Sequence, residues 1–328
     1  MEKKIRTFYQ CGLYTYILAL LIVVGLFRFC GDRWWFATVL LYGPRWIYAI
    51  PMAILLPAAV FWHPRGLPAL GVAALIIVFP IMGLNIPWQS WGQPDRPAEL
   101  RVLTYNVQRW QVSSQEFAEL LEAVQPDVAA VQECAPSRWT LPPQWHVRRA
   151  QTSLVVSKHP ILDVQRWYRN AEVNGIYCVI DAPTGKIGFC CIDLLTPRRA
   201  LTMVLDRETV FNLENVDSAQ GKIANRWQES ARLAKWAGNF PEPKILAGDF
   251  NLTVDSPIYG KYWSPYQNAF SRAGFGFGHT KDTKINIFRY PSRIDHILST
   301  PGFRPVRCWT GPNLGSDHLP LIADFVLE

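Results

Sequence analysis

Hydrophobic positions divide the chain into an apolar N-terminal third and a longer part in which polar and apolar positions alternate. Three apolar stretches occupy the first part, at Gly12–Phe29, Trp46–Trp62 and Leu67–Trp88. A helix needs about 20 apolar residues to cross a bilayer, and the first and third stretches supply them directly. Trp and Tyr flank these stretches, as is typical of residues at a membrane surface. The pattern predicts a multi-pass membrane anchor in residues 1–90, with about three transmembrane helices.

The second apolar stretch leaves the membrane topology open. It is short unless it recruits Trp34–Tyr42 across the Gly-Pro-Arg sequence that follows. Basic residues near the N-terminus favour a cytoplasmic start, and three spans then place the chain after Trp88 outside the cytoplasm. A re-entrant hairpin at Trp34–Trp62 would instead leave that part in the cytoplasm. We expect the extracytoplasmic arrangement.

From Leu100 onward, short apolar runs alternate with amphipathic segments, which is the pattern of an α/β domain. Helices are predicted at Ser114–Val124 and Glu214–Trp236. The predicted strands are Arg101–Val107, Asp127–Gln132, Ser153–Ser157, Gly175–Ile180, Ile187–Leu194, Lys244–Ala247, Ile294–Leu298 and Leu321–Val326. Residues 91–99 are mostly polar and contain two prolines, so we expect a linker before one domain of residues 100–328.

Composition and charge narrow the class of protein. Hydrophobic residues make up 49% of the chain and charged residues 18%, which excludes a disordered or fibrous protein. Seven Lys and Arg against two acids give residues 1–91 a net charge of +5, which leaves +2 for the rest. The second part is therefore not a strongly basic nucleic-acid-binding domain. Its cysteines lack the spacing of metal ligands, and we expect them to be core thiols.

Carboxylates and amides follow several of the predicted strands, where the sites of α/β proteins are built. Hard oxygen ligands of this kind suit Mg²⁺ or Mn²⁺ rather than a thiol-binding metal. A histidine held by a carboxylate can act as an acid or base, or stabilise charge. The candidate residues are Asn106, Glu133, Asp249, Asn251, Asp295, Asp317 and His318.

Five motifs together resemble the endonuclease/exonuclease/phosphatase superfamily, over roughly Leu100–Leu327. They are Tyr105-Asn106, Gln132-Glu133, Gly248–Asn251, Arg293–His296 and Ser316–Pro320. The superfamily includes deoxyribonucleases, abasic-site endonucleases, inositol polyphosphate phosphatases and sphingomyelinases. The resemblance implies a two-sheet α/β sandwich flanked by helices, with a divalent-metal site at one edge. Here the N-terminal transmembrane helical region would precede it.

The resemblance also implies a role for each metal-site residue. Glu133 would bind Mg²⁺ (or Mn²⁺), and Asn106 and Asp317 would complete or support the site. A metal ion there would screen the phosphate charge and lower the pKa of a bound water.

The catalytic roles carry over in the same way. Asp249 would position or deprotonate the attacking water, and Asn251 would hydrogen-bond the phosphoryl oxygens. His318, held by Asp295, would contact the phosphate and stabilise the charge that develops on it.

One motif departs from the family pattern. Where members commonly have a histidine after a strand in the middle of the domain, this chain has Asp193. An ionised aspartate would repel the phosphate. Three interpretations stay open: Asp193 is protonated, it binds a second metal ion, or its task has moved to Arg198 or Arg199. Arg198 is thus a candidate substrate-binding residue, together with Asn251 and His318.

An anchor of several spans before such a domain is similar to bacterial membrane phosphatases of this superfamily, including teicoplanin-resistance proteins of the VanJ type. Gly276–Thr280 is similar to a glycine-rich stretch in those proteins. This resemblance implies hydrolysis of a phosphate ester or pyrophosphate at the outer face of the bacterial plasma membrane. A phosphorylated lipid in the bilayer is then an expected substrate, and no obligate protein partner is expected.

Two alternatives stay open. A membrane-tethered nuclease would use the same chemistry on DNA or RNA, although the near-neutral domain lacks the charge that duplex binding favours. A non-catalytic scaffold that kept the fold has only Asp193 in its favour.

Overall fold

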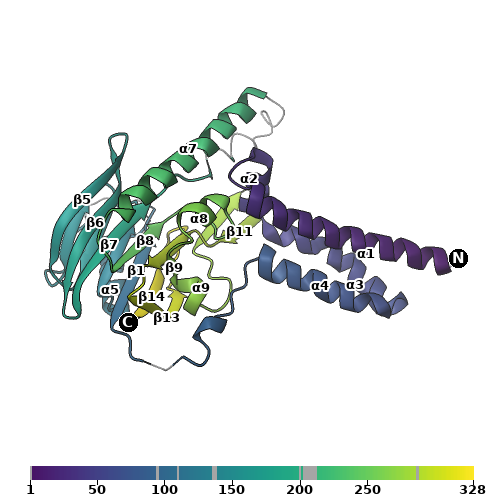
Figure 1. Cartoon of the computed structure of the whole chain (residues 1–328), viewed down its shortest axis with the longest axis horizontal. Coiled ribbons are helices and arrows are strands. Elements are labelled where there is room, and N and C mark those ends of the chain that lie inside the picture. Colours follow the sequence, from purple (N-terminus) through teal and green to yellow (C-terminus); the bar gives the residue numbers. More distant parts are fainter. Residues whose placement is uncertain are drawn as a thin grey trace.

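A computed structural model shows a group of N-terminal helices beside a domain of two sheets (Figure 1). The structure describes residues 2–93, 96–108, 111–134, 139–198, 201, 213–285 and 288–328. Arg199, one of the candidates for the task of the missing histidine, lies outside the described residues.

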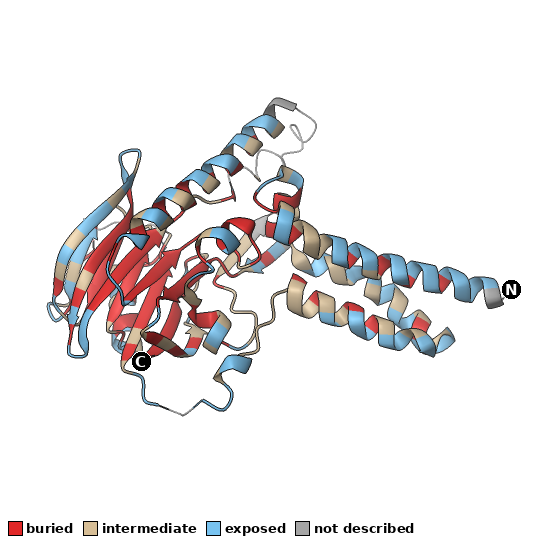
Figure 2. Ribbon diagram, viewed as in Figure 1, coloured by how far each residue is buried: buried red, intermediate tan, exposed pale blue. Residues whose placement is uncertain are grey.

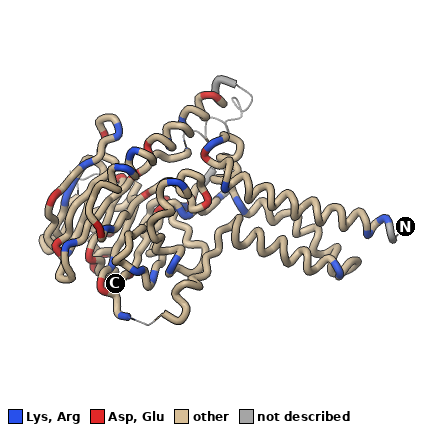
Figure 3. Tube along the Cα trace, viewed as in Figure 1, with Lys and Arg blue, Asp and Glu red and all other residues tan. Residues whose placement is uncertain are grey.

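Three of the N-terminal helices are long and apolar enough to cross a membrane by length and composition, namely Lys4–Cys30, Arg45–Trp62 and Pro64–Ile81. Their segments are α1 (Glu2–Gly25) with the π-turn η1 (Leu26–Cys30), η2 (Arg45–Ala49) with α3 (Ile50–Trp62), and η3 (Pro64–Gly66) with α4 (Leu67–Ile76) and η4 (Ile77–Ile81). Many large apolar residues along them are exposed (Figure 2), and charged residues lie near their ends (Figure 3). Such a surface is expected against lipid rather than water.

The second of these helices begins at Arg45. Trp35–Tyr42 forms a separate helix, α2, which ends where Gly43 and Pro44 adopt extended backbone. The apolar stretch therefore does not recruit Trp34–Tyr42 into one longer span. Instead, α2 lies against the domain, where the backbone nitrogen of Trp35 donates to Gln220 Oε1 at 3.2 Å.

The domain is a sandwich of two six-stranded sheets. The first sheet has the order β13–β14–β1–β2–β4–β3, with strands at Leu100–Asn106 (β1), Val128–Gln132 (β2), His146–Ala150 (β3), Ser153–Ser157 (β4), Phe303–Thr310 (β13) and Leu321–Leu327 (β14). The second has the order β5–β6–β7–β8–β12–β9, with strands at Ile161–Arg169 (β5), Glu172–Ala182 (β6), Gly185–Asp193 (β7), Lys244–Asp249 (β8), Gln267–Asn268 (β9) and Asp295–Ser299 (β12). A separate hairpin pairs β10 (Lys281–Ile285) with β11 (Phe288–Ser292).

The inner faces of the two sheets share one hydrophobic core, in which Val102 and Val155 meet Phe189 and Ile245. Helix α5 (Ser114–Val124) covers the outer face of the first sheet. Helices α7 (Leu213–Gly238) and α8 (Pro257–Tyr262) cover the second. Two short helices, η5 (Trp88–Ser90) and α9 (Ala269–Ala273), complete the described elements. The arrangement confirms the predicted two-sheet α/β sandwich, and the domain's cysteines are buried free thiols as expected.

Candidate active site

The site lies at one edge of the sandwich because strands of both sheets end there. Strands β1 and β2 run parallel, and Asn106 is the last residue of β1 while Glu133 directly follows β2. Strands β7 and β8 also run parallel and end side by side on Asp193 and Asp249. Antiparallel β12 begins opposite Asp249, with Asp295. The topology therefore brings five of the predicted residues to one place.

The backbone around these strand ends is tightly specified. A Cβ atom at Gly248 would lie 1.9 Å from the carbonyl oxygen of Ile192 on the neighbouring strand, so only glycine fits there. Glu133 and Asn251 both adopt left-handed φ angles, +49° and +50°, a backbone conformation that is uncommon for residues other than glycine. Strained backbone of this kind often marks functional sites.

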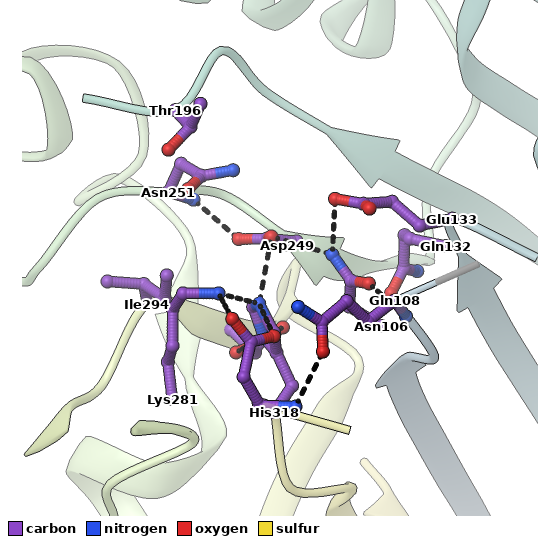
Figure 4. A network of polar contacts seen from close by, with 12 residues as sticks. Asn106, Gln108, Gln132, Glu133, Thr196, Asp249, Asn251, Lys281, Ile294 and His318 are labelled. Atoms are coloured by element: carbon purple, nitrogen blue, oxygen red, sulfur yellow. Dashed lines mark hydrogen bonds and ion pairs between the residues drawn. The ribbon is translucent and has the colours of Figure 1, made fainter. Parts of the chain in front are cut away.

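Asn106 joins the two sheets at the centre of the site (Figure 4). Its Nδ2 donates to Glu133 Oε1 at 3.1 Å and to Asp249 Oδ2 at 3.0 Å. Its Oδ1 accepts from the backbone nitrogen of Gln108 at 3.0 Å, which fixes the orientation of the amide. Asn251, at the far side of Asp249, donates its backbone nitrogen to Asp249 Oδ1 at 2.9 Å. Asp249 is therefore held on both oxygens.

His318 forms a buried pair with Asp295 and also contacts Lys281. Its Nδ1 lies 2.9 Å from Asp295 Oδ2, and Lys281 Nζ lies 2.7 Å from its Nε2. Since Nδ1 donates to Asp295, Nε2 is the atom that accepts from Lys281, and the imidazole in this contact is neutral. Burial opposes a charge on His318, but Asp295 and Asp249 outweigh it and raise its pKa. A protonated His318 would push Lys281 away.

Lys281, the first residue of β10, is a site residue that the sequence analysis did not identify. Its Nζ also donates to Asp317 Oδ2 at 2.8 Å, and Arg198 Nη2 donates to the same oxygen at 3.1 Å. Only 10% of the Lys281 side chain is exposed. No motif marks it, because the β10–β11 hairpin folds it against His318 from outside the two sheets.

Asp249 and Asp193 both bind protons more strongly than ordinary aspartates. Burial and the nearby Asp295 raise the pKa of Asp249 to about 6, against the opposing effect of His318. Loss of hydration raises the pKa of Asp193 well above its usual value, and the charges of Asp249 and Glu133 add to the effect. Burial and the neighbouring carboxylates therefore favour the neutral form of the Asp193 carboxyl.

Two of the side chains offer oxygens that fit a divalent cation such as Mg²⁺. Glu133 and Asp317 supply carboxylate oxygens, which are hard ligands, whereas Asn106 turns its amide nitrogen toward Glu133 and supports the site by hydrogen bonding. Asp317 Oδ1 is buried and lacks a hydrogen-bond partner, as expected of an oxygen that awaits a ligand. Lys281 and Arg198 partly neutralise Asp317 through its other oxygen and lower its pKa against the effect of burial.

A second set of metal-binding groups adjoins the first. Ligand atoms of Asp249, Asp295 and His318 lie within 4.8 Å of one another, the one such group of three found among the described residues. The hydrogen bonds between Asp295 and His318 already occupy Nδ1 of this histidine. This set can therefore bind a proton and stabilise charge without a metal ion.

Two clefts open onto the site. The larger, about 1310 Å³, is lined by Glu133, Asp193 and Asn251 and, further out, by Arg169 and Arg232. The smaller, about 420 Å³, is lined by Asn251, Lys281, Asp317 and Arg198 together with Tyr42 of α2. Asn251 lines both clefts, so a phosphate group beside it would be reachable from either side.

The predicted residues thus fall into one cluster, with Arg198 at its rim. Asn251 lies 6% exposed and its Nδ2 donates to the carbonyl of Leu194 at 2.8 Å. Arg198 is half exposed and reaches the cluster through Asp317. The structure places the other described candidate side chains around Asp249.

Comparisons with known proteins agree with this geometry. The chain belongs to the endonuclease/exonuclease/phosphatase family, whose sequence profile matches residues 103–318. A search of curated proteins finds no match. Members of this family are hydrolases of phosphoesters or nucleic acids.

Solved structures share the fold at low sequence identity. A 3′–5′ exonuclease from Neisseria meningitidis is 16% identical, with a TM-score of 0.52 over 69% of this chain and 99% of its own. An AP endonuclease from Archaeoglobus fulgidus is 16% identical, with a TM-score of 0.50 over 70% of this chain and 99% of its own. A family protein from Beutenbergia cavernae is also 16% identical, with a TM-score of 0.50 over 70% of this chain and 72% of its own.

Proposed function

We propose that the protein is a membrane-anchored, divalent-metal-dependent phosphoesterase that hydrolyses a phosphate ester or pyrophosphate carried by a lipid. The proposal divides the chain into an anchor of residues 1–90, a linker of residues 91–99 and a catalytic domain of residues 100–328. The family supports hydrolysis, and the following geometry supports the lipid substrate.

The observation that carries the proposal is the position of the smaller cleft. One wall consists of catalytic candidates such as Lys281 and Asp317, while another includes Tyr42 and Leu201. These two residues also belong to the hydrophobic cluster of the N-terminal helices. A phosphate at Asn251 would therefore lie beside the apolar helices, where a lipid could deliver it without leaving the bilayer surface.

Buried polar contacts link the N-terminal helices to the site. Asp32, fully buried before α2, pairs with Arg226 of α7, and Arg226 Nη2 donates to the carbonyl oxygen of Asn251 at 2.6 Å. Tyr42 Oη donates to Asp32 Oδ2 at 2.9 Å. The loop that follows β8 and holds Asn251, called the catalytic loop below, is thus held at a set distance from the helices, as a lipid substrate requires.

In the proposed mechanism this chain's own residues position a water and receive charge. The ionised Asp249, oriented by Asn106 and Asn251, accepts a proton from the attacking water. Lys281 faces the transferred phosphoryl group and stabilises its growing negative charge. His318, whose pKa is raised by Asp295 and Asp249, donates to the same group from Nε2 once it is protonated and has released Lys281. A cation held by Glu133 and Asp317, with Asn106 supporting Glu133 by a hydrogen bond, would supply Lewis-acid activation of the phosphate.

Asp193 acts as a neutral hydrogen-bond donor in this mechanism. Its protonated carboxyl replaces the donor that a histidine would offer, and an asparagine would preserve that donor. We expect Asp193→Asn to keep activity within about tenfold and Asp193→Ala to lose about 10²-fold in kcat. Steady-state kinetics of the two variants test this. Equal losses in both would show that Asp193 has no donor role.

The arrangement of the helices supports an extracytoplasmic catalytic domain. The N-terminus and the domain lie at opposite ends of the three helices (Figure 1). Arg65 lies at the N-terminal end together with the basic residues of the first six positions, which favours that end as cytoplasmic. At the domain end, Arg28 and Arg45 share the single carboxylate of Asp255, so one of their two charges is compensated there.

The decisive experiment measures phosphate release by the full-length protein in detergent with Mg²⁺ or Mn²⁺. Undecaprenyl pyrophosphate and related lipid phosphates are the substrates, and nicking of plasmid DNA is measured in parallel. Asp249→Ala should abolish release, whereas Asp181→Ala, an exposed aspartate on β6, should not. Lipid phosphate release that requires Asp249 supports the proposal. If protein that binds metal neither releases lipid phosphate nor nicks DNA, the result would favour a non-catalytic scaffold.

A membrane-tethered nuclease is the second candidate function. A Neisseria 3′ phosphatase bound to a product DNA hairpin shares the fold, with a TM-score of 0.50 and 14% identity. Arg169 and Arg232 line the larger cleft, where they could contact a polynucleotide backbone. Nicking that depends on Asp249, without lipid phosphate release, would establish this alternative.

A further inference from the structure

A separate cavity lies where the N-terminal helices meet the domain. It has a volume of about 130 Å³, on the order of four water molecules at ~30 Å³ each. Trp46, Met82 and Phe277 form apolar parts of its wall, and Arg45 and Arg293 are its arginines. Trp46 and Met82 stand at the domain ends of the second and third apolar helices.

Arg293 is a buried cation with hydrogen-bond donors that lack acceptors. Its side chain is 9% exposed, and both Nε and Nη1 are buried without a hydrogen-bond partner. Its guanidinium stacks 4.6 Å from the ring centre of Phe270, which engages the flat face but not the N–H groups. Buried donors without acceptors are costly, so this side chain is expected to have an acceptor when the protein functions.

The cavity also carries excess positive charge. Asp255 is the one acidic residue among the described residues that line it. Its two oxygens already pair with Arg28 at 3.1 Å and with Arg45 at 2.8 Å. Arg293 therefore has no carboxylate of its own, and an anion is the ligand that would compensate it.

We propose that this cavity binds the phosphate group of an anionic ligand, of which a membrane lipid headgroup is the favoured source. Arginine donates two parallel hydrogen bonds to phosphate oxygens, and the apolar walls formed by Trp46, Met82 and Phe277 suit the hydrocarbon part of a lipid beside its phosphate. The ends of the apolar helices would place the cavity at headgroup depth. Tyr290 and Ser292 line both this cavity and the smaller catalytic cleft, so a bound lipid would lie beside the active site without occupying it.

The proposal uses the membrane placement but not the hydrolytic activity, so binding is measured in EDTA on the Asp249→Ala protein. The full-length chain in detergent is titrated with dihexanoyl phosphatidylglycerol, with dihexanoyl phosphatidylcholine and with inorganic phosphate. Native mass spectrometry counts bound lipid, and thermal unfolding reports stabilisation by either ligand. We expect phosphatidylglycerol to bind and the zwitterionic lipid to bind less. Equal stabilisation by inorganic phosphate, dependent on Arg293, would identify free phosphate as the ligand.

Arg293→Met separates binding from folding. It removes the buried charge at similar volume, so it should weaken phosphatidylglycerol binding about tenfold or more without lowering the melting temperature of the ligand-free protein. Arg304→Met is the matched control. Arg304 is on β13, pairs with Glu328 and does not line the cavity. Met82→Trp fills the cavity and leaves Arg293 intact, so it decides the matter if Arg293→Met fails to fold. Binding that survives both variants overturns the proposal.

Discussion

Lys281 illustrates what a single side chain adds to the site. It bridges Asp317 and His318 at 2.8 and 2.7 Å, so removal of its charge leaves the phosphate one donor fewer. Lys281→Met should lower kcat by about 10²-fold, and Lys281→Arg should recover part of the loss. Steady-state kinetics measure both, with Lys186→Met, at an exposed position at the start of β7, as the control. An unchanged kcat in Lys281→Met would assign Lys281 a purely structural role.

The protonation of Asp249 predicts the acidic limb of the pH profile. Burial and Asp295 raise its pKa to about 6, so below that pH the carboxyl is protonated and cannot accept a proton from water. Activity should therefore rise with pH through about 6, rather than near the ordinary aspartate value of about 4. The dependence of kcat/KM on pH tests this. A profile that is already flat at about pH 5 would contradict Asp249 as the base.

Single residues also show what could be predicted from sequence. Asn106, Glu133 and Asp249 follow strands whose apolar runs are visible, so their meeting at one sheet edge was predictable. Lys281 was not, because its position depends on a hairpin outside the sheets. The unpaired donors of Arg293 could not be predicted either. Whether a side chain has an acceptor depends on how the folded chain packs around it, not on the spacing of residues in the sequence.

At the scale of elements, the contact between β7 and β8 depends on Gly248. A Cβ there would lie 1.9 Å from the Ile192 carbonyl oxygen, so Gly248→Ala must separate the strands that end on Asp193 and Asp249. We expect a loss of about 3 kcal/mol in stability and loss of activity. Gly221→Ala is the contrasting variant, because Gly221 is an exposed residue of α7 with open space at its Cβ. It should stabilise by about 0.5–1 kcal/mol, and thermal unfolding measures both.

The strands that sequence reasoning missed share a physical property. The predicted strands are buried and apolar, as in β2 and β4, where every residue is buried. Of the strands that were not predicted, β3, β5 and β13 include exposed or charged positions and lie at the edges of the two sheets. Their pairing partners, rather than their own hydrophobic pattern, determine that they are extended.

At the scale of the whole molecule, the pair of Asp32 and Arg226 links the N-terminal helices to the catalytic loop. Asp32 also accepts from Ser256 Oγ at 2.6 Å, and Arg226 Nε donates to the carbonyl of Leu195 at 3.1 Å. The link thus reaches the loops that follow both β7 and β8. A displacement of the helices would therefore be transmitted to the residues around Asp249.

Arg226→Met tests this link. It leaves Asp32 buried without its cation, which should cost about 3–5 kcal/mol of stability, and it removes the donor that holds the Asn251 carbonyl, so kcat should fall as well. The double variant Asp32→Asn/Arg226→Met should recover most of the stability, because no buried charge remains unpaired. It should not recover kcat, because the Asn251 carbonyl still lacks the guanidinium donor of Arg226. Thermal unfolding and kinetics of the single and double variants separate the two effects. If the double variant recovered both stability and kcat, the pair would serve folding alone, and the helices would anchor the enzyme without setting the geometry of its site.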